Sequence, residues 1–228
     1  TRRTNPDGLV VADITNPFYP ENARGVQDVA RKKDYNVMLC NTDDDGKNEM
    51  EILHLLNAQG ADGIILFSHS ADEASIRAFA DNFSPIGMIN RHIDHPNIYT
   101  MKVDNVHGET LAVTHFIEQQ HQHIGMLTNS TYSLSQMRRV QGFRQTIQAH
   151  GLPFTEDNIV AGQPTLTGGY EALKKLLALN GEITAVFAYN DLMGIGALRA
   201  CRDLGLNVPQ ELSLIGFDNI LLASLVTP

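Results

Sequence analysis

The chain has 228 residues and a formal net charge of −9, and it is 43% hydrophobic and 19% charged. This composition is typical of a globular protein with a well-buried core, and the acidic charge argues against nucleic-acid binding by this stretch, because phosphate neutralisation needs clustered lysines and arginines. No apolar run approaches the roughly 18 residues of a membrane span, and the chain opens with no signal peptide, so we expect a cytoplasmic protein.

The first structured stretch is GLVVADITNPFYP. Its aliphatic run over 8–14 predicts a strand covered on both faces, as in a parallel sheet, and Pro20 fits the first turn of a following helix. Ligands of open α/β sheets bind at the carboxyl ends of strands. The loop after this strand therefore supplies the first candidate binding residues, Asn16, Phe18 and Tyr19, although Phe18 and Tyr19 could equally cover the core beneath the loop.

Apolar runs then alternate with amphipathic stretches along the chain. This alternation predicts a mostly parallel sheet with helices on both faces and right-handed crossovers. After a polar interruption near Pro96 the pattern resumes, so we expect two similar α/β halves split near residue 100. The expected strands are 8–14, 36–41, 63–67, 85–89, 98–103, 123–128, 158–161, 184–189 and 212–217, and the expected helices are 20–33, 47–59, 71–82, 105–120, 136–149, 168–179 and 191–204.

Polar side chains follow nearly every expected strand. Polarity there is partly trivial, because turns and helix caps favour Asn, Asp, Ser and Thr. We expect Asp43 to Asp45 and Asp191 to serve mainly as caps. The less trivial residues are Arg91, Asn190 just inside a strand, and Asp218 after the FD pair.

The expected helix over 191–204 is apolar or small on every side between Leu192 and Leu198, and the segment ILLASLV at 220–226 is equally apolar. A helix that is hydrophobic all round is buried all round. Two interpretations remain: a subunit contact, which predicts a homodimer, or a helix internal to its own domain.

Recognisable catalytic and metal motifs are missing from the sequence. A calcium loop starting at Asn41 would place Ile52 where a bidentate glutamate is needed, and His121 and His123 do not have zinc-ligand spacing. Cys40 and Cys201 fit buried free thiols in a reducing compartment. No nucleophile elbow, phosphate loop or CxxC pair occurs, so we expect neither a metal, a cofactor nor an enzyme.

Several motifs in order resemble the lactose/galactose-repressor (LacI/GalR) family of bacterial transcription regulators. They are RTNPDGLVVADITNPFYPENARGVQDVARKKDYNVMLCNTDDD, MINR, KVDN, RRVQGF, AVFAYNDLMGIGALRACRDLGLNVPQELSLIGFDN and LVTP, and together they cover essentially the whole chain. The resemblance implies two Rossmann-like lobes of the periplasmic-binding-protein type with a ligand cleft between them. It also implies a preceding DNA-binding headpiece, so that residues 1–7 are linker, 8–102 the N-terminal lobe, 103–226 the C-terminal lobe and 227–228 the start of a second lobe crossing.

The same resemblance implies which residues bind a ligand. It places Phe18 and Tyr19 at the mouth of the first lobe, Asn190 at the end of the AVFAYN strand and Asp218 in the FDN turn. Two departures put the ligand's identity in doubt: Asn90 stands where aspartate is common, and Pro164 where an aromatic is frequent. The full set of expected ligand residues is Asn16, Phe18, Tyr19, Arg91, Asp104, Ser133, Ser135, Arg139, Asn190 and Asp218, with Ser133, Ser135 and Arg139 in the loop leading to RRVQGF.

These residue types suit a sugar-like ligand. Arg139 and Asp218 can bind adjacent hydroxyls in bidentate fashion, and an aromatic ring can cover the C–H face of a sugar. Alternative roles are a structural Arg139–Asp218 ion pair and a purely hinge-holding Asp104. The sequence therefore predicts the effector-binding, dimeric core of a transcriptional repressor that controls operator DNA binding. The alternatives are a periplasmic-type sugar-binding protein of a transport system and a sugar-phosphate or nucleotide-sugar enzyme.

Overall fold

A computed structural model describes residues 6–227 of the chain. The fold consists of two compact units, one ending at Val103 and the other beginning at Asp104. Residues 1–5 and 228 lie outside the described part, and with them most of the expected linker and the last residue of the expected second crossing. Residues 6 and 7, also expected in the linker, belong to the first strand.

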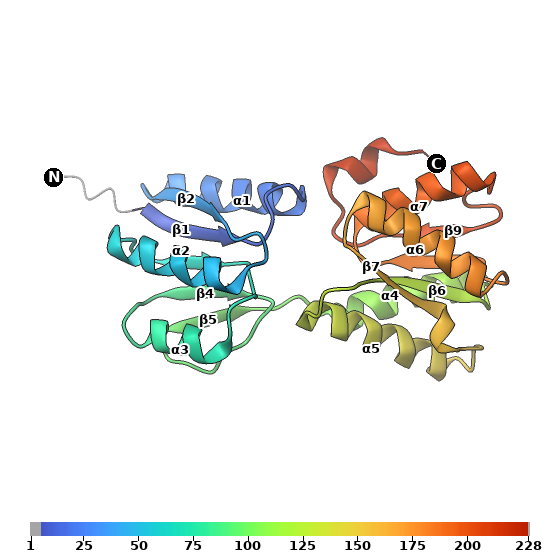
Figure 1. Cartoon of the computed structure of the whole chain (residues 1–228), viewed down its shortest axis with the longest axis horizontal. Helices are drawn as coiled ribbons and strands as arrows, with labels where there is room; N and C mark the ends of the chain where they lie inside the picture. Colours follow the sequence, from blue (N-terminus) through green and yellow to red (C-terminus); the bar gives the residue numbers. More distant parts are fainter. Residues whose placement is uncertain (1–5, 228) are drawn as a thin grey trace. The chain divides into compact units, whose positions relative to one another are not determined.

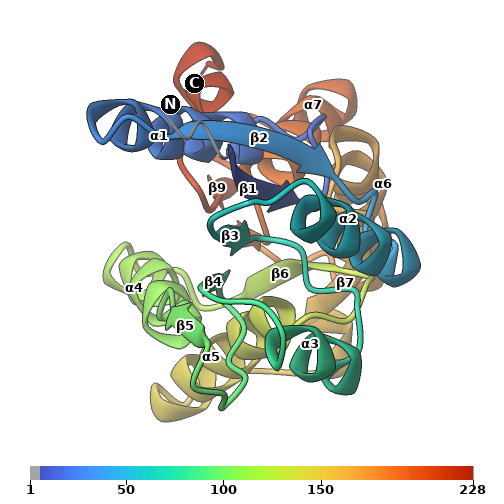
Figure 2. The ribbon, with the colours of Figure 1, turned by 90° about the vertical axis from the view of Figure 1, so that its left-hand side faces the viewer.

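The first unit contains one parallel sheet of five strands in the order β2-β1-β3-β4-β5 (Figures 1 and 2). One helix connects each of the strands β1 to β4 to the next, so these connections are β-α-β crossovers, as the alternating pattern predicts. The elements are β1 (Pro6–Val11), α1 (Phe18–Lys32), β2 (Asn36–Asn41), α2 (Gly46–Ala58), β3 (Ile64–Leu66), α3 (Glu73–Ala80), β4 (Ile86–Ile89) and β5 (Ile98–Met101).

Successive residues of β1 point to opposite faces of this sheet. Val10 packs with α2 and α3, whereas Leu9 and Val11 pack with α1 and Phe67. Alternate side chains of a strand face opposite sides, so a strand covered on both faces must be apolar throughout. Beside α1 the sheet carries a groove of about 1060 Å³, lined in part by Ile65 and Tyr99.

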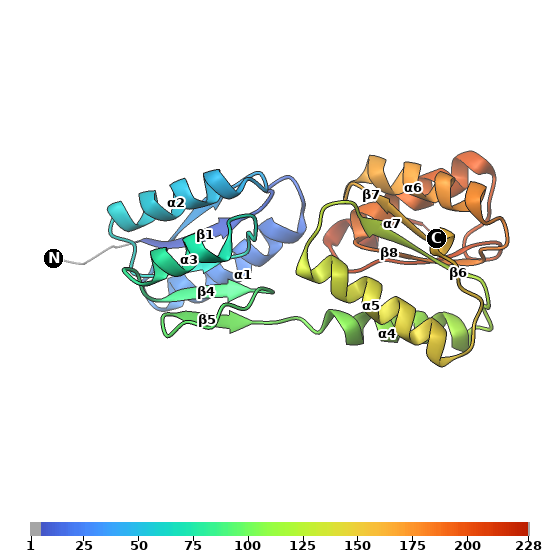
Figure 3. The same cartoon turned by 60° about the horizontal axis from the view of Figure 1, so that its bottom comes forward.

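The second unit contains a parallel sheet of four strands in the order β7-β6-β8-β9 (Figures 1 and 3). Helices α4 and α5 pack on one face and α6 and α7 on the other. The elements are α4 (Asn105–Glu118), β6 (Ile124–Asn129), α5 (Leu134–Ala149), the 3-10 helix η1 (Glu156–Asn158), β7 (Ile159–Gly162), α6 (Leu166–Leu179), β8 (Ala185–Ala188), α7 (Asp191–Leu204), β9 (Ser213–Ile215) and the 3-10 helix η2 (Leu221–Leu225).

Helices α6 and α7 approach closely because glycines lie at their contact. A Cβ atom on Gly169 of α6 would lie 2.1 Å from the carbonyl oxygen of Met193, and one on Gly196 of α7 would lie 2.0 Å from that of Leu166. No Cβ atom can be placed so near another backbone. The small residues of the LMGIGAL stretch therefore serve packing inside the unit, as the internal-helix interpretation requires.

The segment after β9 covers another part of α7. Its 3-10 helix lies near Ile195 and Leu198, which line a cavity shared with Ala223 and Val226. Leu221 and Leu225 of the same segment are 67% and 69% exposed. These two leucines leave an apolar part of the segment uncovered by its own unit, where the expected subunit contact stays a prediction, whereas α7 itself is largely covered.

Strand β5, expected over 98–103, pairs with β4 and belongs to the first sheet. The expected end of the first strand was wrong. The first strand ends at Val11, and Ile14, expected to be buried in it, is 45% exposed. The strand stops there because Asp13 forms a turn with Thr15, whose amide donates to the Asp13 carboxylate at 2.8 Å.

Both cysteines are free thiols. Cys201 is buried, as expected, and burial raises the pKa of its thiol to about 11. Cys40 is only half-buried on β2, contrary to the expectation, because this strand is at the edge of its sheet. Neither thiol therefore has the depressed pKa of a reactive cysteine.

Candidate functional site

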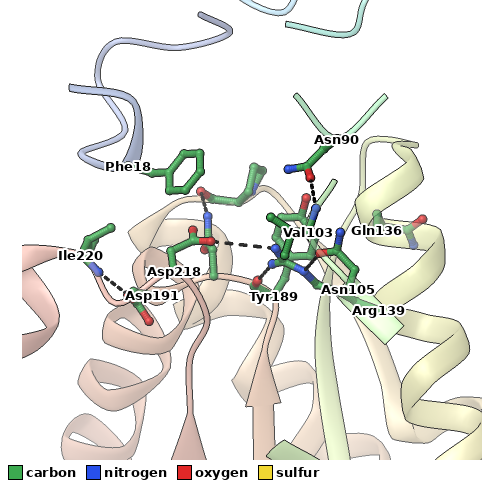
Figure 4. A network of polar contacts seen from close by, with 12 residues as sticks. Phe18, Asn90, Val103, Asn105, Gln136, Arg139, Tyr189, Asp191, Asp218 and Ile220 are labelled. Carbon is green, nitrogen blue, oxygen red and sulfur yellow. Dashed lines mark hydrogen bonds and ion pairs between the residues drawn. The ribbon is translucent and has the colours of Figure 1, made fainter. Parts of the chain in front are cut away.

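Arg139 is the centre of a buried polar cluster in the second unit (Figure 4). It lies on α5 and is only 6% exposed. Its Nε donates a hydrogen bond to Asn105 Oδ1 at 2.9 Å, and a terminal nitrogen donates to the carbonyl oxygen of Tyr189. The guanidinium carbon lies 3.6 Å from the ring centre of Phe217 and 4.5 Å from that of Tyr189. Hydrogen bonds and two aromatic rings thus fix the plane of the guanidinium.

Asp218 is the acidic partner of Arg139. Its Oδ1 lies 3.8 Å from a terminal nitrogen of the guanidinium, and both side chains are largely buried. Burial raises the pKa of the Asp218 carboxyl to about 7, further raised by Asp191 and opposed by Arg139. Asp218 lies in the turn after β9 with a positive φ of 102°, a backbone conformation that few non-glycine residues adopt. This conformation sets the direction of the Asp218 side chain. The structural ion pair considered as an alternative role for these two residues is therefore present.

The turn between β8 and α7 departs from the sequence-based expectation. Asn190 lies outside the strand, which ends at Ala188, and it is the N-cap of α7. Its Oδ1 accepts from the Met193 amide at 2.9 Å, and its amide nitrogen donates to the carbonyl oxygen of Pro164 at 3.2 Å. Asp191, expected to be the cap, is instead the first helical residue, and its Oδ2 accepts from the Ile220 amide at 2.8 Å. Asp191 therefore ties the turn after β9 to α7.

Three further candidates lie at the starts of α4 and α5. Asp104 is the N-cap of α4 and accepts from the His107 amide at 3.0 Å. Ser133 is the N-cap of α5 and accepts from the Gln136 amide at 3.1 Å. Ser135, expected in the loop leading to RRVQGF, lies within α5, as does Arg139, which the expected helix over 136–149 already contained. The helix begins two residues earlier than expected because Ser133 caps it.

Asn16, Phe18 and Tyr19 belong to the first unit. Asn16 accepts a hydrogen bond from the Phe18 amide at 3.1 Å. The rings of Phe18 and Tyr19 pack edge to face, with 5.3 Å between their centres, and each also contacts Phe67. Both rings belong to the cluster around Leu9 and are half-buried. They thus cover the core beneath the loop, as the second interpretation of these residues held, and each keeps an exposed part.

Arg91 follows β4 and braces a neighbouring loop. One of its terminal nitrogens donates to the Ala71 carbonyl oxygen at 2.7 Å and lies 3.4 Å from that of His69. Glu49 of α2 also binds this loop. Its carboxylate is fully buried and accepts a hydrogen bond from the Ser70 amide at 2.9 Å. Arg91 therefore has a structural role in this conformation, and its remaining donors are available for a ligand.

Sequence reasoning missed four residues of the Arg139 cluster: Asn105, Glu109, Tyr189 and Phe217. Three of them stand directly beside an expected residue in the motifs KVDN, AYN and FDN, so the motifs themselves were the available signal. Glu109 gave no signal, because a glutamate on a helix is usually solvent-exposed.

Within residues 6–227, no helix is long and apolar enough to cross a membrane. In that same range no group of three or more His, Cys, Asp or Glu side chains is arranged to hold a metal ion. The polar clusters described above are therefore organised by hydrogen bonds and ion pairs.

Two parallel α/β units with polar side chains at the carboxyl ends of their strands define the class of periplasmic-binding-protein-like effector domains. Residues 6–226 match the family described as periplasmic binding proteins and sugar binding domain of the LacI family, and the chain belongs to this family. It is the core of a LacI-type transcription regulator, and its relatives do not favour a transport protein.

Curated relatives are similar over the whole chain. It is 34% identical to the HTH-type transcriptional regulator DegA of Bacillus subtilis, with all of this chain and 68% of that protein covered. It is 31% identical to the catabolite control protein A of Priestia megaterium, with 100% and 69% covered. The first of these relatives is named as a transcriptional regulator.

Solved structures agree with this assignment. A sugar-binding transcriptional regulator of the LacI family from Escherichia coli, complexed with phosphate, superimposes with a TM-score of 0.84 at 28% identity over 99% of this chain and 82% of that one. A LacI-family regulator from Enterococcus faecium with bound ribose has a TM-score of 0.86 at 27% identity, over 98% and 81%. The expected fold of two parallel α/β lobes is thus confirmed.

Proposed function

We propose that this chain is the effector-sensing core of a transcriptional repressor and that it binds a small sugar or sugar-like metabolite. The observation that carries the proposal is the buried pair of Arg139 and Asp218, with 3.8 Å between nitrogen and oxygen, beside the turns that follow β8 and β9. Ligands of open α/β sheets bind at this end of the strands.

The chemistry of the pair suits a polyhydroxylated ligand. A guanidinium donates to hydroxyl oxygens, and a carboxylate accepts from hydroxyl protons, so adjacent hydroxyls of one sugar can satisfy both groups. The ion pair at 3.8 Å is long enough that a ligand can compete for it without leaving either group unpaired. Buried groups that demand partners discriminate strongly against ligands lacking the matching hydroxyl.

The remaining expected ligand residues are proposed as contributors. Phe18 and Tyr19 offer ring faces to the C–H surface of a sugar, and Arg91 offers its unused donors. Asn16, Asp104, Ser133 and Asn190 already accept from backbone amides as turn or cap residues, so their contribution to binding is through remaining lone pairs or through shaping the loops. Ser135 is half-buried on the first turn of α5 and completes the set.

The proposal extends to partners. Relatives named as regulators and repressors support operator DNA as the target, which a headpiece outside this acidic stretch would bind, and a homodimer as the working form. Effector binding would then act by favouring one of two arrangements of the protein. A regulator of this kind works in the cytoplasm and catalyses no reaction.

A thermal-shift panel tests the proposal. Monosaccharides, disaccharides, sugar phosphates, sugar acids, nucleosides and purine bases are added at increasing concentration. A ligand at about one hundred times its dissociation constant adds roughly 2.7 kcal/mol of stability. We expect one sugar-like compound to raise the melting temperature, with loss of the shift in R139K and D218N.

The matched control is R144Q. Arg144 lies on the same helix as Arg139 but pairs with exposed Glu156, so this variant should keep the shift. A nucleobase that shifts the protein would overturn the ligand class, and a sugar shift that survives in both cluster variants would overturn the site.

A further inference from the structure

Glu109 is a fully buried carboxyl with no role in the site as described so far. It lies on α4, is 0% exposed, and neither of its carboxyl oxygens accepts or donates a hydrogen bond within the described residues. A buried polar group normally has a partner, because leaving it unpaired costs the desolvation of that group. Its position therefore calls for a physical reason.

The packing of α4 on α5 places Glu109 next to Arg139. Glu109 follows Asn105 by four residues, so both lie on the same face of α4, and Asn105 is the acceptor for Arg139 Nε. On α5, Gly142 lies three residues after Arg139, and a Cβ atom there would come within 2.8 Å of the Glu109 Cβ. Because Gly142 has no side chain, the Glu109 side chain fits against α5 about one helical turn away from Arg139.

Burial and the nearby Arg139 both act on the carboxyl of Glu109. Burial raises the pKa of its carboxyl well above the usual value, and Arg139, the charged group that acts on it from α5, opposes this rise. On α5, the Gly142 backbone that approaches Glu109 accepts from the Thr146 hydroxyl, an uncharged donor, at 2.8 Å. Arg139 itself is acted on by Tyr189 and Asp191 from the β8–α7 turn and by Asp218 from the turn after β9.

We propose that Glu109 is a titratable positioning residue for Arg139. When Glu109 is protonated, the guanidinium of Arg139 stays hydrogen-bonded to Asn105 and near Asp218. When Glu109 is ionised, its carboxylate draws the guanidinium away from Asp218. An ionised carboxylate in this interior needs a positive partner, and Arg139 is the cation within reach. Given the effector site proposed above, on which this consequence rests, effector binding weakens when Glu109 ionises.

The first test detects the proton. Asp218 also has a raised pKa, so the infrared spectra are compared in the D218N background, above the usual pH range in which a glutamate loses its proton. D218N should show the carbonyl stretch of a protonated carboxylic acid, and this band should weaken when E109Q is added. The control is E118Q in the same background, because Glu118 is an exposed carboxyl on the same helix, and it should keep the band. A band that E109Q leaves unchanged, or no such band in D218N, would overturn the proposal.

The second test follows Arg139 directly. In ¹⁵N-labelled protein, the Nε–H resonance of Arg139 is assigned by its absence from R139K and followed from acidic to alkaline pH. The wild type should show a step, above the usual titration range of a glutamate, that is lost in E109Q. D218N should keep this step and lose the one near pH 7, where Asp218 titrates. A titration curve of Arg139 Nε–H that is the same in E109Q as in the wild type would refute the role of Glu109.

If E109Q does not fold, E109M gives the same two readouts with an uncharged stem of similar length. Neither measurement needs an effector. A failed thermal-shift panel therefore leaves the result on Glu109 intact, and a failed titration leaves the proposed sugar site intact.

Discussion

Asn105 Oδ1 accepts a hydrogen bond from Arg139 Nε at 2.9 Å, which joins the first turn of α4 to α5 inside the second unit. Asn105 is 3% exposed and Arg139 6% exposed, so water cannot replace this bond. The orientation of the guanidinium toward Tyr189 and Asp218 therefore depends on a residue outside the ligand-binding set that the sequence indicated.

The first prediction is that N105A destabilises the protein by about 1–3 kcal/mol, because it leaves a buried charged donor unpaired. The free energy of unfolding in urea measures this loss. Q148A, which changes an exposed residue of α5, should stay within about 0.5 kcal/mol of the wild type. Equal stability of N105A and Q148A would mean that the bond does not hold Arg139.

The second prediction concerns pH and Asp218. Its pKa is raised from 3.8 to about 7 in the folded protein, so the folded state binds the proton more tightly than the unfolded chain. The resulting stabilisation is present below about pH 4 and is lost as pH rises toward 7, at about 1.36 kcal/mol per unit. Relative to D218N, the wild type should therefore lose roughly 3 kcal/mol of stability between pH 5 and pH 8.

Urea unfolding of both proteins at the two pH values gives this difference, and groups common to both cancel. If the wild type instead gained stability relative to D218N as the pH rises, the pH dependence of the stability difference would have the opposite sign to that predicted. In that case the attraction of Arg139 at 3.8 Å would outweigh burial, and Asp218 would be ionised throughout this range.

The order of strands and helices could be predicted from the sequence because apolar runs, which in the central strands pack on both sides, alternate with amphipathic stretches. The clearest example is 124–128, where every residue is buried. Element ends were harder to predict. Ile14 is apolar yet lies beyond the strand, since a side-chain turn at Asp13 decides the end, and Asn190 is a cap rather than a strand residue.

The candidate site was predictable to the extent that motifs mark it. Arg139 and Asp218 were expected from the resemblance, and they lie together in the second unit. Asn105 and Glu109 could not be singled out, because a polar residue on a helix is buried only if the neighbouring helix leaves room. Here that room depends on Gly142, more than thirty residues further along the chain.

The third prediction is that Glu49 holds the loop at 68–71. Its Oε2 accepts from the Ser68 hydroxyl at 2.5 Å and from the Ser70 amide at 2.9 Å, and Glu49 is fully buried. E49A should cost about 3 kcal/mol, because it leaves several buried donors unpaired, and should speed hydrogen exchange at Ser70.

The control for this variant is E51A on the same helix. Glu51 is exposed and pairs with exposed Lys47 at 3.6 Å, so its loss should change stability by less than about 0.5 kcal/mol. If E49A were as stable as E51A, the buried carboxylate would not be what orders this loop, and the support of Arg91 through Ala71 would have to come from elsewhere.

The fourth prediction compares two helical glycines. A Cβ atom on Gly169 would lie 2.1 Å from the carbonyl oxygen of Met193, whereas one on Gly25 of α1 meets nothing within 4 Å. Adding atoms to a filled core typically costs about 1–3 kcal/mol, and here rigid backbone must move, so G169A should lose at least about 3 kcal/mol. G25A should gain up to about 1 kcal/mol, because alanine favours a helix over glycine.

Thermal melts of the two variants, which add the same methyl group, separate the effect of packing from that of helix propensity. G196A provides an independent check from the other helix, since its Cβ would lie 2.0 Å from the Leu166 carbonyl oxygen, and it should resemble G169A. Melting of G169A at or above the wild-type temperature would contradict the close approach of α6 and α7. The apolar stretch of α7 would then be free to form a subunit contact, as the alternative interpretation of that stretch proposed.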